Sequence, residues 1–307
     1  MPILEVKDLS ISFKQYTSFW KEKTIKAISS LNVMVEEGEI VAVVGASGSG
    51  KSLLAHAILG ILPSKASIDG GILFQGKELT PELQKTLRGR EISLVPQSVN
   101  SLDPLMKIGS QVRNSVNNRD AFTAQREIFK RYQLKTEVEK KYPFELSGGM
   151  ARRALLSTAM VSQAKLIIAD EPTPGLDADV LEKALNHIRE LADTGSAVLF
   201  ITHDIESALK IADKIAVFYA GTTVEIAPVE NFKGKGEKLR HPYSKALWRA
   251  LPQNDFIPIP GTQPIPSNLP EGCLFATRCE WTTPDCRAVR PVMRELRNGM
   301  VRCIHAT

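Results

Sequence analysis

The sequence predicts an α/β fold that combines a parallel-sheet core, an inserted helical region and a small cysteine-containing C-terminal extension. Three observations lead to this prediction. A glycine-rich loop joins a fully apolar strand to a helix, and further apolar strands alternate with helices after residue 160, which is the pattern of a parallel sheet with helical crossovers. The third observation is that all 4 cysteines of the chain lie after residue 272.

Composition limits the class of protein. The chain has 307 residues, of which 43% are hydrophobic and 24% are charged, so it is globular rather than disordered. Its net charge of +5 is a smaller excess than nucleic-acid binding proteins usually concentrate. No apolar run approaches the roughly 18 residues of a membrane span, and the charged start of the chain is unlike a signal peptide. We therefore expect a cytosolic chain with no nucleic-acid partner.

Short apolar alternations predict strands in the first 45 residues. The last of these strands, over 40–44, is fully apolar and runs directly into the glycine loop. After the loop, residues 53–62 have helical apolar spacing and stop before Pro63. The order of strand, loop and helix therefore begins the parallel core.

The middle of the chain, from about 98 to 160, is polar and helical, with helices predicted over 126–132 and 148–160 and no strand between them. The predicted core continues with strands over 166–169, 197–201 and 215–219 and a helix over 179–192. Six prolines between 252 and 270 exclude a helix or a central strand there. We therefore divide the chain into a domain over 1–230 that includes the helical region 98–160, a helix and proline-rich linker over 231–270, and an extension over 271–307.

Residues 45–52 form a complete phosphate-binding P-loop. Glycines let backbone N–H groups approach a phosphate closely, and the following helix directs its positive N-terminus at the same charge. Lys51 is predicted to neutralise the β- and γ-phosphate oxygens, and Ser52 to ligate Mg²⁺. The predicted ATP-binding residues of the loop and the start of the helix are Gly45, Ser47, Gly48, Ser49, Gly50, Lys51, Ser52 and Leu53.

An acidic pair completes this predicted site. The strand over 166–169 is followed by Asp170 and Glu171. Asp170 can hold the metal, and Glu171 can accept a proton from the attacking water or orient it. An acidic pair after a buried strand is also a common loop start, so the assignment depends on the P-loop that accompanies it.

A second candidate anion site lies at 146–150, which reads Leu-Ser-Gly-Gly-Met. Ser147 and two glycine N–H groups stand there at the N-terminus of a predicted helix. At this point the chain resembles the ATP-binding cassette family, the nucleotide-binding subunits of ABC transporters. The signature motif of that family is Leu-Ser-Gly-Gly, usually followed by Gln where this chain has Met150. A serine N-cap with a flexible lead-in would be the better interpretation if the motif stood alone.

Other motifs of the family occur in the same order. Gln97 matches the Q-loop, residues 174–177 match the D-loop, and His203 matches the switch histidine. The resemblance covers residues 3 to about 230 and implies a P-loop ATP-binding cassette with an N-terminal antiparallel β subdomain, a parallel-sheet core and a helical subdomain. Because Glu171 and His203 are both present, we expect a competent ATPase.

The resemblance also implies a mechanism that needs two cassettes. In the family they pair head to tail, so that ATP lies between the P-loop of one and the signature motif of the other. Glu171 and His203 would be catalytic, and Mg²⁺ would be held through Ser52, Gln97 and Asp170. The residues expected to contact the ATP of the partner cassette in trans are Ser147, Gly148, Gly149 and Asp177. The adenine is expected to stack on an aromatic residue near Phe13, with Tyr16, Phe19 and Trp20 in an unusually long loop beside it.

Three segments narrow the resemblance to the ATPases of oligopeptide, dipeptide and nickel importers. They are Ser-Leu-Asp-Pro at 101–104, His-Pro-Tyr-Ser-Lys-Ala-Leu at 241–247 and the cysteine-containing tail. In that group the ATPase is one of two non-identical subunits at the cytoplasmic face of the membrane, attached to two permeases and served by an extracytoplasmic binding protein. A soluble ABC ATPase and an exporter ATPase are the alternative functions.

The cysteines Cys273, Cys279, Cys286 and Cys303 form the last candidate site. Their spacing lacks the close pairs of structural zinc sites, and a cytosol disfavours disulfides. Four thiolates suit a [4Fe–4S] cluster, and resemblance to the peptide-importer tail favours it. Free cysteines and a zinc site stay open as alternatives, with His305 a possible substitute ligand.

Overall fold

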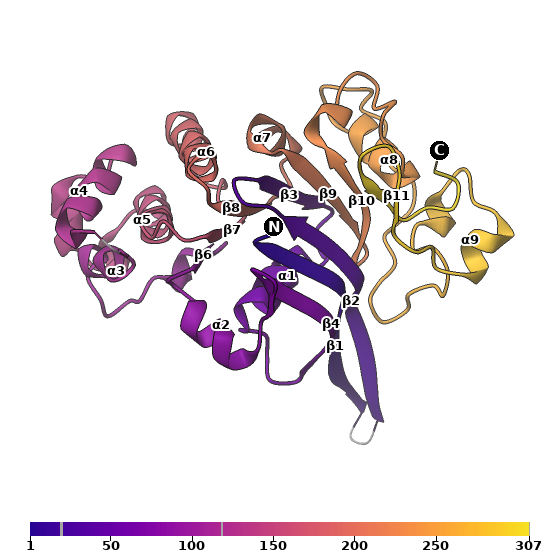
Figure 1. Ribbon diagram of the computed structural model, residues 1–307, viewed down its shortest axis with the longest axis horizontal. Helices are drawn as coiled ribbons and strands as arrows, with labels where there is room; N and C mark the ends of the chain where they lie inside the picture. Colours follow the sequence, from indigo (N-terminus) through magenta and orange to yellow (C-terminus); the bar gives the residue numbers. More distant parts are fainter. Residues whose placement is uncertain (19–20, 118, 307) are drawn as a thin grey trace.

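The computed structural model describes residues 1–18, 21–117 and 119–306 and contains two sheets (Figure 1). The first sheet consists of β1 (Leu4–Ser18), β2 (Lys21–Val35), β4 (Ala66–Phe74) and β5 (Lys77–Glu78). The second consists of β3 (Ile40–Gly45), β6 (Ile92–Val95), β7 (Leu166–Asp170), β8 (Ala197–Ile201), β9 (Lys214–Tyr219), β10 (Thr222–Pro228), β11 (Arg294–Glu295) and β12 (Met300–Val301). The helices are α1 (Lys51–Leu59), α2 (Pro81–Leu87), α3 (Ile108–Asn114), α4 (Ala121–Arg131), α5 (Gly148–Met160), α6 (Ala178–Asp193), α7 (Ile205–Ile211), α8 (Pro242–Arg249) and α9 (Pro284–Ala288).

The second sheet is the core of the molecule. Its strand order is β11-β12-β10-β9-β3-β8-β7-β6, and the five strands from β9 to β6 are parallel. Each of these strands is buried on both faces, which explains why it reads as a continuous apolar run. Along β3, Ile40 and Ala42 face one hydrophobic cluster with residues of α5 and α6, whereas Val41 and Val43 face another with α1 and the first sheet. The predicted α/β class with an antiparallel N-terminal sheet is confirmed.

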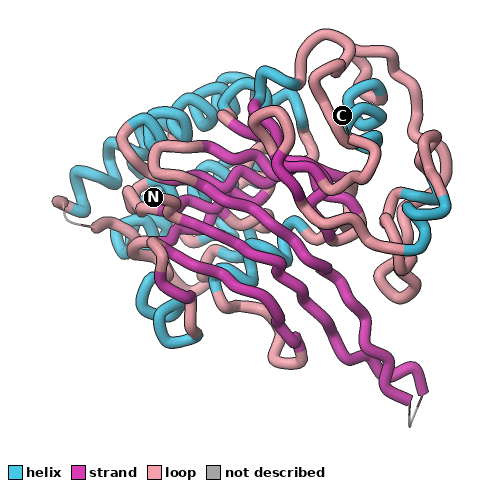
Figure 2. Tube along the Cα trace, turned by 45° about the vertical axis from the view of Figure 1, so that its right-hand side comes forward, coloured by secondary structure: helices cyan, strands magenta, loops and turns pink. Residues whose placement is uncertain are grey.

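The first sheet is antiparallel and is dominated by the hairpin of β1 and β2, which extends away from the body of the molecule (Figure 2). Pairing along this hairpin continues from Leu4 opposite Val35 out to Ser18 opposite Lys21. The expectation of a long loop around Tyr16 is therefore wrong, because the backbone there is strand. Phe19 and Trp20 lie outside the described residues.

The helical region is formed by α3, α4 and α5, which lie together at one end of the molecule (Figure 1). Within its described residues from 98 to 160 no strand occurs, as predicted. The helix predicted over 126–132 begins earlier, at Ala121, because Asp120 caps it by accepting a hydrogen bond from the backbone N–H of Thr123 (2.7 Å). The helix predicted over 53–62 ends at Leu59, because Gly60 adopts a left-handed conformation with φ +64°.

The C-terminal segment lies at the opposite end of the molecule, beside β10 (Figure 1). Residues 252–270 contain neither helix nor strand. The tail does not stand apart from the cassette, because β12 pairs with β10 through Val301 opposite Glu225. Arg302 reinforces this junction by donating to the backbone oxygens of Thr223 (3.0 Å) and Ser30 (2.7 Å). The extension is therefore held by the main sheet as well as by its own small cluster around Cys303.

Candidate functional site

The P-loop connects β3 to α1 and has the backbone geometry that its glycines predict. At Gly45 a Cβ atom would lie 2.3 Å from the backbone oxygen of Phe218, so no other residue fits there. Gly50 precedes α1 with φ +93°, which L-residues rarely adopt. Ser47 and Gly48 are exposed, so the outer side of the loop is open to a ligand. Leu53 is half-buried in the first turns of α1.

Lys51 lies across this loop. Its Nζ donates to the backbone oxygens of Gly45 (2.9 Å) and Ala46 (3.2 Å), and the residue is only 6% exposed. Burial lowers the pKa of Lys51, while the charges of Glu171 and Asp170 oppose that shift. The ammonium group therefore stands inside the loop and next to the acidic end of β7.

Ser52 and Asp170 join the P-loop to β7. The Ser52 hydroxyl donates to Asp170 Oδ1 at 3.2 Å, and Asp170 is 4% exposed. Burial raises the pKa of Asp170, and the neighbouring charge of Glu171 adds to the shift. A hydroxyl and a carboxylate side by side are oxygen ligands that Mg²⁺ accepts, so these residues fit the predicted metal. Lys51 faces the same place and supplies a positive charge there.

Glu171 is the centre of the site. Its Oε2 accepts a hydrogen bond from Gln97 Nε2 at 3.0 Å, and its Oε1 lies 3.2 Å from His203 Nδ1. Gln97, Glu171 and His203 follow β6, β7 and β8, and the carboxyl ends of these parallel neighbours meet at one edge of the sheet. The structure thus brings together three predicted residues from distant parts of the sequence. The Gln97 side chain donates its hydrogen bond to Glu171, and neither Ser52 nor Asp170 takes part in that bond.

The signature residues lie elsewhere. Ser147 is the N-cap of α5 and accepts from the backbone N–H of Met150 at 3.4 Å. Ser147 and Gly148 are exposed. In the described part of the chain, no hydrogen bond or ion pair joins Ser147, Gly148 or Gly149 to the P-loop. A Cβ at Gly148 would meet nothing within 4 Å, and one at Gly149 would meet only the end of the Arg153 side chain at 4.0 Å.

Two further predicted ATP contacts have local partners. Asp177 is the N-cap of α6, accepting from the backbone N–H of Val180 at 3.0 Å, and its carboxylate lies 3.9 Å from Arg153. Phe13 is half-buried on β1, opposite Ile25 of β2. The assignments of both residues to ATP stay predictions.

The four cysteines are gathered in the tail. Burial raises the pKa of Cys273 to about 11, and the neighbouring thiols of Cys303, Cys286 and Cys279 add to the shift. Thr283 Oγ1 links Cys286 Sγ (3.5 Å) to His305 Nε2 (3.1 Å). Among the described residues no three His, Cys, Asp or Glu side chains are arranged to hold one metal ion. The donor chemistry of four thiols suits a thiolate-bound cluster.

Arg152 was missed by the sequence analysis. This residue of α5 is 4% exposed and donates hydrogen bonds to the backbone oxygens of Gln97 and Glu171 and of their neighbours Pro96 and Pro172. The signal was available, because Arg152 stands three and four positions before the apolar Leu155 and Leu156, on the face of the helix that the apolar spacing buries.

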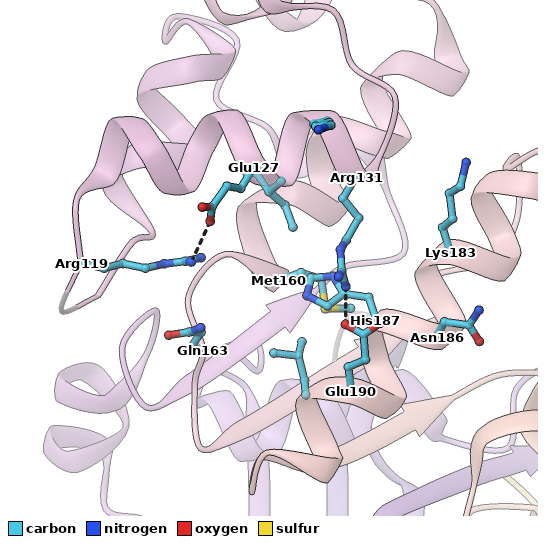
Figure 3. Close-up of a pocket in the computed structure, with 12 residues that line it drawn as sticks. Arg119, Glu127, Arg131, Met160, Gln163, Lys183, Asn186, His187 and Glu190 are labelled. Carbon is cyan, nitrogen blue, oxygen red and sulfur yellow. Dashed lines mark hydrogen bonds and ion pairs between the residues drawn. The ribbon is translucent and has the colours of Figure 1, made fainter.

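A separate pocket of about 680 Å³ lies between α4, α5 and α6 (Figure 3). Two ion pairs line it, Arg119 with Glu127 at 3.4 Å and Arg131 with Glu190 at 2.7 Å. His187 is buried there, and a hydrogen bond of 2.8 Å joins its Nδ1 to Tyr132 Oη. None of the predicted ATP-site residues lines this pocket.

Comparisons with known proteins agree with this geometry. A model of the ABC transporter family matches residues 28–174, and a model described as the oligopeptide/dipeptide transporter C-terminal region matches residues 224–286. The oligopeptide transport ATP-binding protein OppD of Haemophilus influenzae is 33% identical over 320 residues, covering 98% of this chain and 96% of that protein. OppD of Bacillus subtilis is 35% identical over 300 residues, covering 91% of this chain and 82% of that protein.

Solved structures show the same fold. A dimeric post-hydrolysis state of the ATP-binding cassette MJ0796 bound to ADP and Pi matches with a TM-score of 0.64 and 23% sequence identity, covering 75% of this chain and 99% of that one. Fold, site and relatives define the chain as an ATP-binding protein of the ABC transporters, that is, an ABC-type ATPase. Within that class it belongs to the family of oligopeptide/dipeptide transporter ATP-binding proteins. No helix in the described part of the chain has the length and apolar character needed to cross a bilayer.

Proposed function

We propose that this chain hydrolyses ATP at a site shared with a second, non-identical ATPase subunit, and that hydrolysis drives peptide uptake through two membrane permeases. The observation that carries the proposal is the position of Glu171, whose carboxylate contacts Gln97 at 3.0 Å and His203 at 3.2 Å. A carboxylate held from two sides at the end of a buried strand is suited to orient one water molecule and to accept its proton.

The remaining residues take roles that their surroundings support. Lys51 and the N–H groups of the P-loop bind the phosphates, which would replace the loop carbonyls that the ammonium group now contacts. Ser52 and Asp170 hold Mg²⁺, which supplies charge neutralisation of the phosphate oxygens. Gln97 orients Glu171 through their hydrogen bond and would also be a ligand of Mg²⁺, and His203 would hold the γ-phosphate.

The glycines of the signature motif support a shared site. Nothing within 4 Å of Gly148 inside the chain requires a glycine there, yet the residue is exposed at the start of α5. An exposed helix N-terminus without side chains leaves backbone N–H groups accessible to an anion from another molecule. We infer that Ser147, Gly148 and Gly149, together with Asp177, contact ATP held by the partner subunit.

The transporter context follows from the relatives. OppD of Haemophilus influenzae and of Bacillus subtilis are named oligopeptide transport proteins, and we extend that cargo to this chain. We place the chain peripherally at the cytoplasmic face of the membrane, with cargo delivered by an extracytoplasmic binding protein. Nickel complexes are the alternative cargo, because the motifs at 101–104 and 241–247 resemble peptide and nickel importers alike.

We also propose that the four tail cysteines bind a [4Fe–4S] cluster. The mutual effect of the four thiols on the pKa of Cys273 supports their proximity, and all-cysteine ligation is usual for such clusters. Cys273, Cys279, Cys286 and Cys303 would be the ligands, and binding would draw their side chains closer together. The cluster would stabilise the tail and takes no part in ATP chemistry.

The test is to purify the tagged chain from membranes together with whatever binds it, for wild type and Glu171→Gln. We expect two hydrophobic permeases and a second ATPase to copurify, and Glu171→Gln to bind ATP while turnover falls about 10²- to 10⁴-fold. Copurification of ribosomes or nucleic acid would favour a soluble ABC ATPase instead. Near-normal turnover of the variant would remove Glu171 from its role.

A further inference from the structure

Arg152 connects the signature helix to the hydrolysis site. Its guanidinium donates to the backbone oxygens of Pro96 (3.1 Å), Gln97 (2.6 Å) and Pro172 (3.3 Å), and also to that of Glu171. All four acceptors lie in two segments, the loop after β6 and the loop after β7. A single buried side chain therefore ties together the two loops that carry Gln97 and Glu171.

This use of an arginine is unusual because it is buried without a carboxylate partner. Arg152 is 4% exposed, and among the described residues it forms no ion pair. Burial lowers its pKa, while the more distant charges of Glu171 and Asp170 oppose that shift. Burying a guanidinium has a desolvation cost, and the Arg152 side chain offsets it with four hydrogen bonds to main-chain oxygens. The planar fork of an arginine can hold several such oxygens in fixed directions.

The contact is made at a constrained point of the backbone. Glu171 has φ +46°, in the left-handed region that non-glycine residues seldom occupy. Its N–H donates to the backbone oxygen of Ile201 at 2.8 Å, and its carbonyl accepts from Arg152. The peptide groups on both sides of Glu171 are therefore fixed, and with them the direction in which its side chain leaves the backbone; contacts with Gln97 and His203 then hold the carboxylate.

We propose that Arg152 is a positioning residue for ATP hydrolysis, which holds the backbone of Gln97 and Glu171 so that their side chains meet in the arrangement that orients water. This inference rests on the proposed function. Because Arg152 is in the second turn of α5, the helix that Ser147 begins, it also links the signature motif mechanically to the hydrolysis site of its own chain. Loss of the guanidinium frees both loops while leaving the P-loop contacts with phosphate intact.

A purely structural role would have different consequences. Arg302 provides the comparison, because it is 6% exposed and donates to three backbone oxygens, those of Thr223, Pro291 and Ser30, at the junction with the tail. If burial of a guanidinium only stabilises the fold, then changes at Arg152 and Arg302 lower stability alike and affect the turnover of folded protein alike. If Arg152 positions Glu171, its loss lowers kcat specifically.

The experiment compares Arg152→Met, which removes every donor at similar volume, with Arg152→Lys, Arg302→Met and the surface variant Arg131→Gln. ATP hydrolysis by the complex copurified with the second ATPase subunit is followed in single turnover with protein in excess, and ATP binding and thermal unfolding are measured on the same variants. We expect Arg152→Met to lower the hydrolysis rate about 10- to 100-fold with a Kd for ATP within about threefold of wild type. Arg152→Lys should recover only part of the rate, because an ammonium group cannot reach both loops at once.

The outcomes separate the possibilities. A folded Arg152→Met protein with the wild-type rate, or a loss matched by Arg302→Met, would overturn the proposal. Full rescue by Arg152→Lys would also overturn it, since positive charge and not the fork would then suffice. If Arg152→Met fails to fold, Arg152→Lys decides, because a wild-type rate in that variant refutes positioning and a reduced rate with normal ATP binding supports it. Glu171→Gln in parallel tests the proposed function, since full turnover there contradicts that function whatever Arg152 does.

Discussion

Two buried histidines predict how the stability of this protein depends on pH. His241 is 1% exposed and accepts a hydrogen bond on Nδ1 from the backbone N–H of Tyr243 at 3.0 Å. Burial, assisted by the charge of Arg302, lowers its pKa to about 3. His187 is 9% exposed, and burial, assisted by the charge of Arg131, lowers its pKa to about 4. Both side chains therefore remain neutral in the folded protein under mildly acidic conditions.

The magnitude follows from the difference between folded and unfolded states. An unfolded histidine has a pKa of about 6.5, so at about pH 5 it binds a proton that the folded state does not accept. Each histidine then favours unfolding by roughly 1.5 pH units times 1.36 kcal/mol, or about 2 kcal/mol. The pKa of each histidine is lower in the folded than in the unfolded state. The free energy of unfolding therefore has its full value above about pH 6.5 and decreases as the pH is lowered.

The assay is urea unfolding at about pH 7.5 and about pH 5 for wild type, His241→Asn, His187→Gln and the double variant. Asn retains an oxygen that can cap α8 without titrating, and Gln retains an acceptor for Tyr132 Oη. We expect each single variant to lose about 2 kcal/mol less than wild type on acidification, and the double variant about 4 kcal/mol less. An unchanged pH dependence in His241→Asn would refute the reasoning for that residue.

Three further predictions concern the P-loop, the signature motif and the cysteine-containing tail. Lys51→Ala should abolish ATP binding by this chain, whereas Ser147→Arg should bind ATP normally but fail to pair with the second subunit when ATP is added. Sedimentation with and without ATP measures the pairing. If Ser147→Arg still pairs in an ATP-dependent way, the shared site is contradicted. Gly148→Ala should leave the unfolding midpoint unchanged, because the added Cβ meets nothing within 4 Å, while slowing hydrolysis in the assembled complex at least about tenfold. If Gly148→Ala hydrolysed ATP at the wild-type rate, no phosphate would approach the backbone of Gly148. Anaerobically purified protein should be brown with about four irons per chain, and a colourless preparation with stoichiometric zinc would refute the cluster.

The parallel core was predictable because burial on both faces leaves a plain signal. The strand predicted over 197–201 coincides with β8, and that over 166–169 is extended only by Asp170 in β7. The helix predicted over 148–160 coincides with α5, since Ser147 and the glycines mark its start. Helix ends were less predictable where a single residue decides them, as Asp120 does for α4 and Gly60 for α1.

The meeting of three predicted residues could be foreseen from the sequence, but the contacts that each of them makes could not. Sequence order gives the loops after β6, β7 and β8, and the meeting of Gln97, Glu171 and His203 follows from the parallel arrangement of these strands. The direction of the Gln97 side chain does not follow from it, because a loop residue can turn toward the metal or toward Glu171. The apolar spacing of α5 could have indicated that Arg152 is buried, but its acceptors are main-chain oxygens, which the sequence does not reveal.

The pairing of β12 with β10 has a consequence for how the chain reaches its native state. Strand β10 ends at Pro228, whereas the strand that covers its outer side begins at Met300, so Glu225 and Val301 can meet only when a long intervening segment closes into a loop. Closing such a loop is entropically costly, which makes this pairing a late event. Until then β10 is a free edge with unpaired backbone groups, open to pairing with another chain. We therefore expect that the tail, by covering this edge at Glu225 and Ile226, lowers the tendency of the chain to aggregate, whether or not its cysteines bind a group.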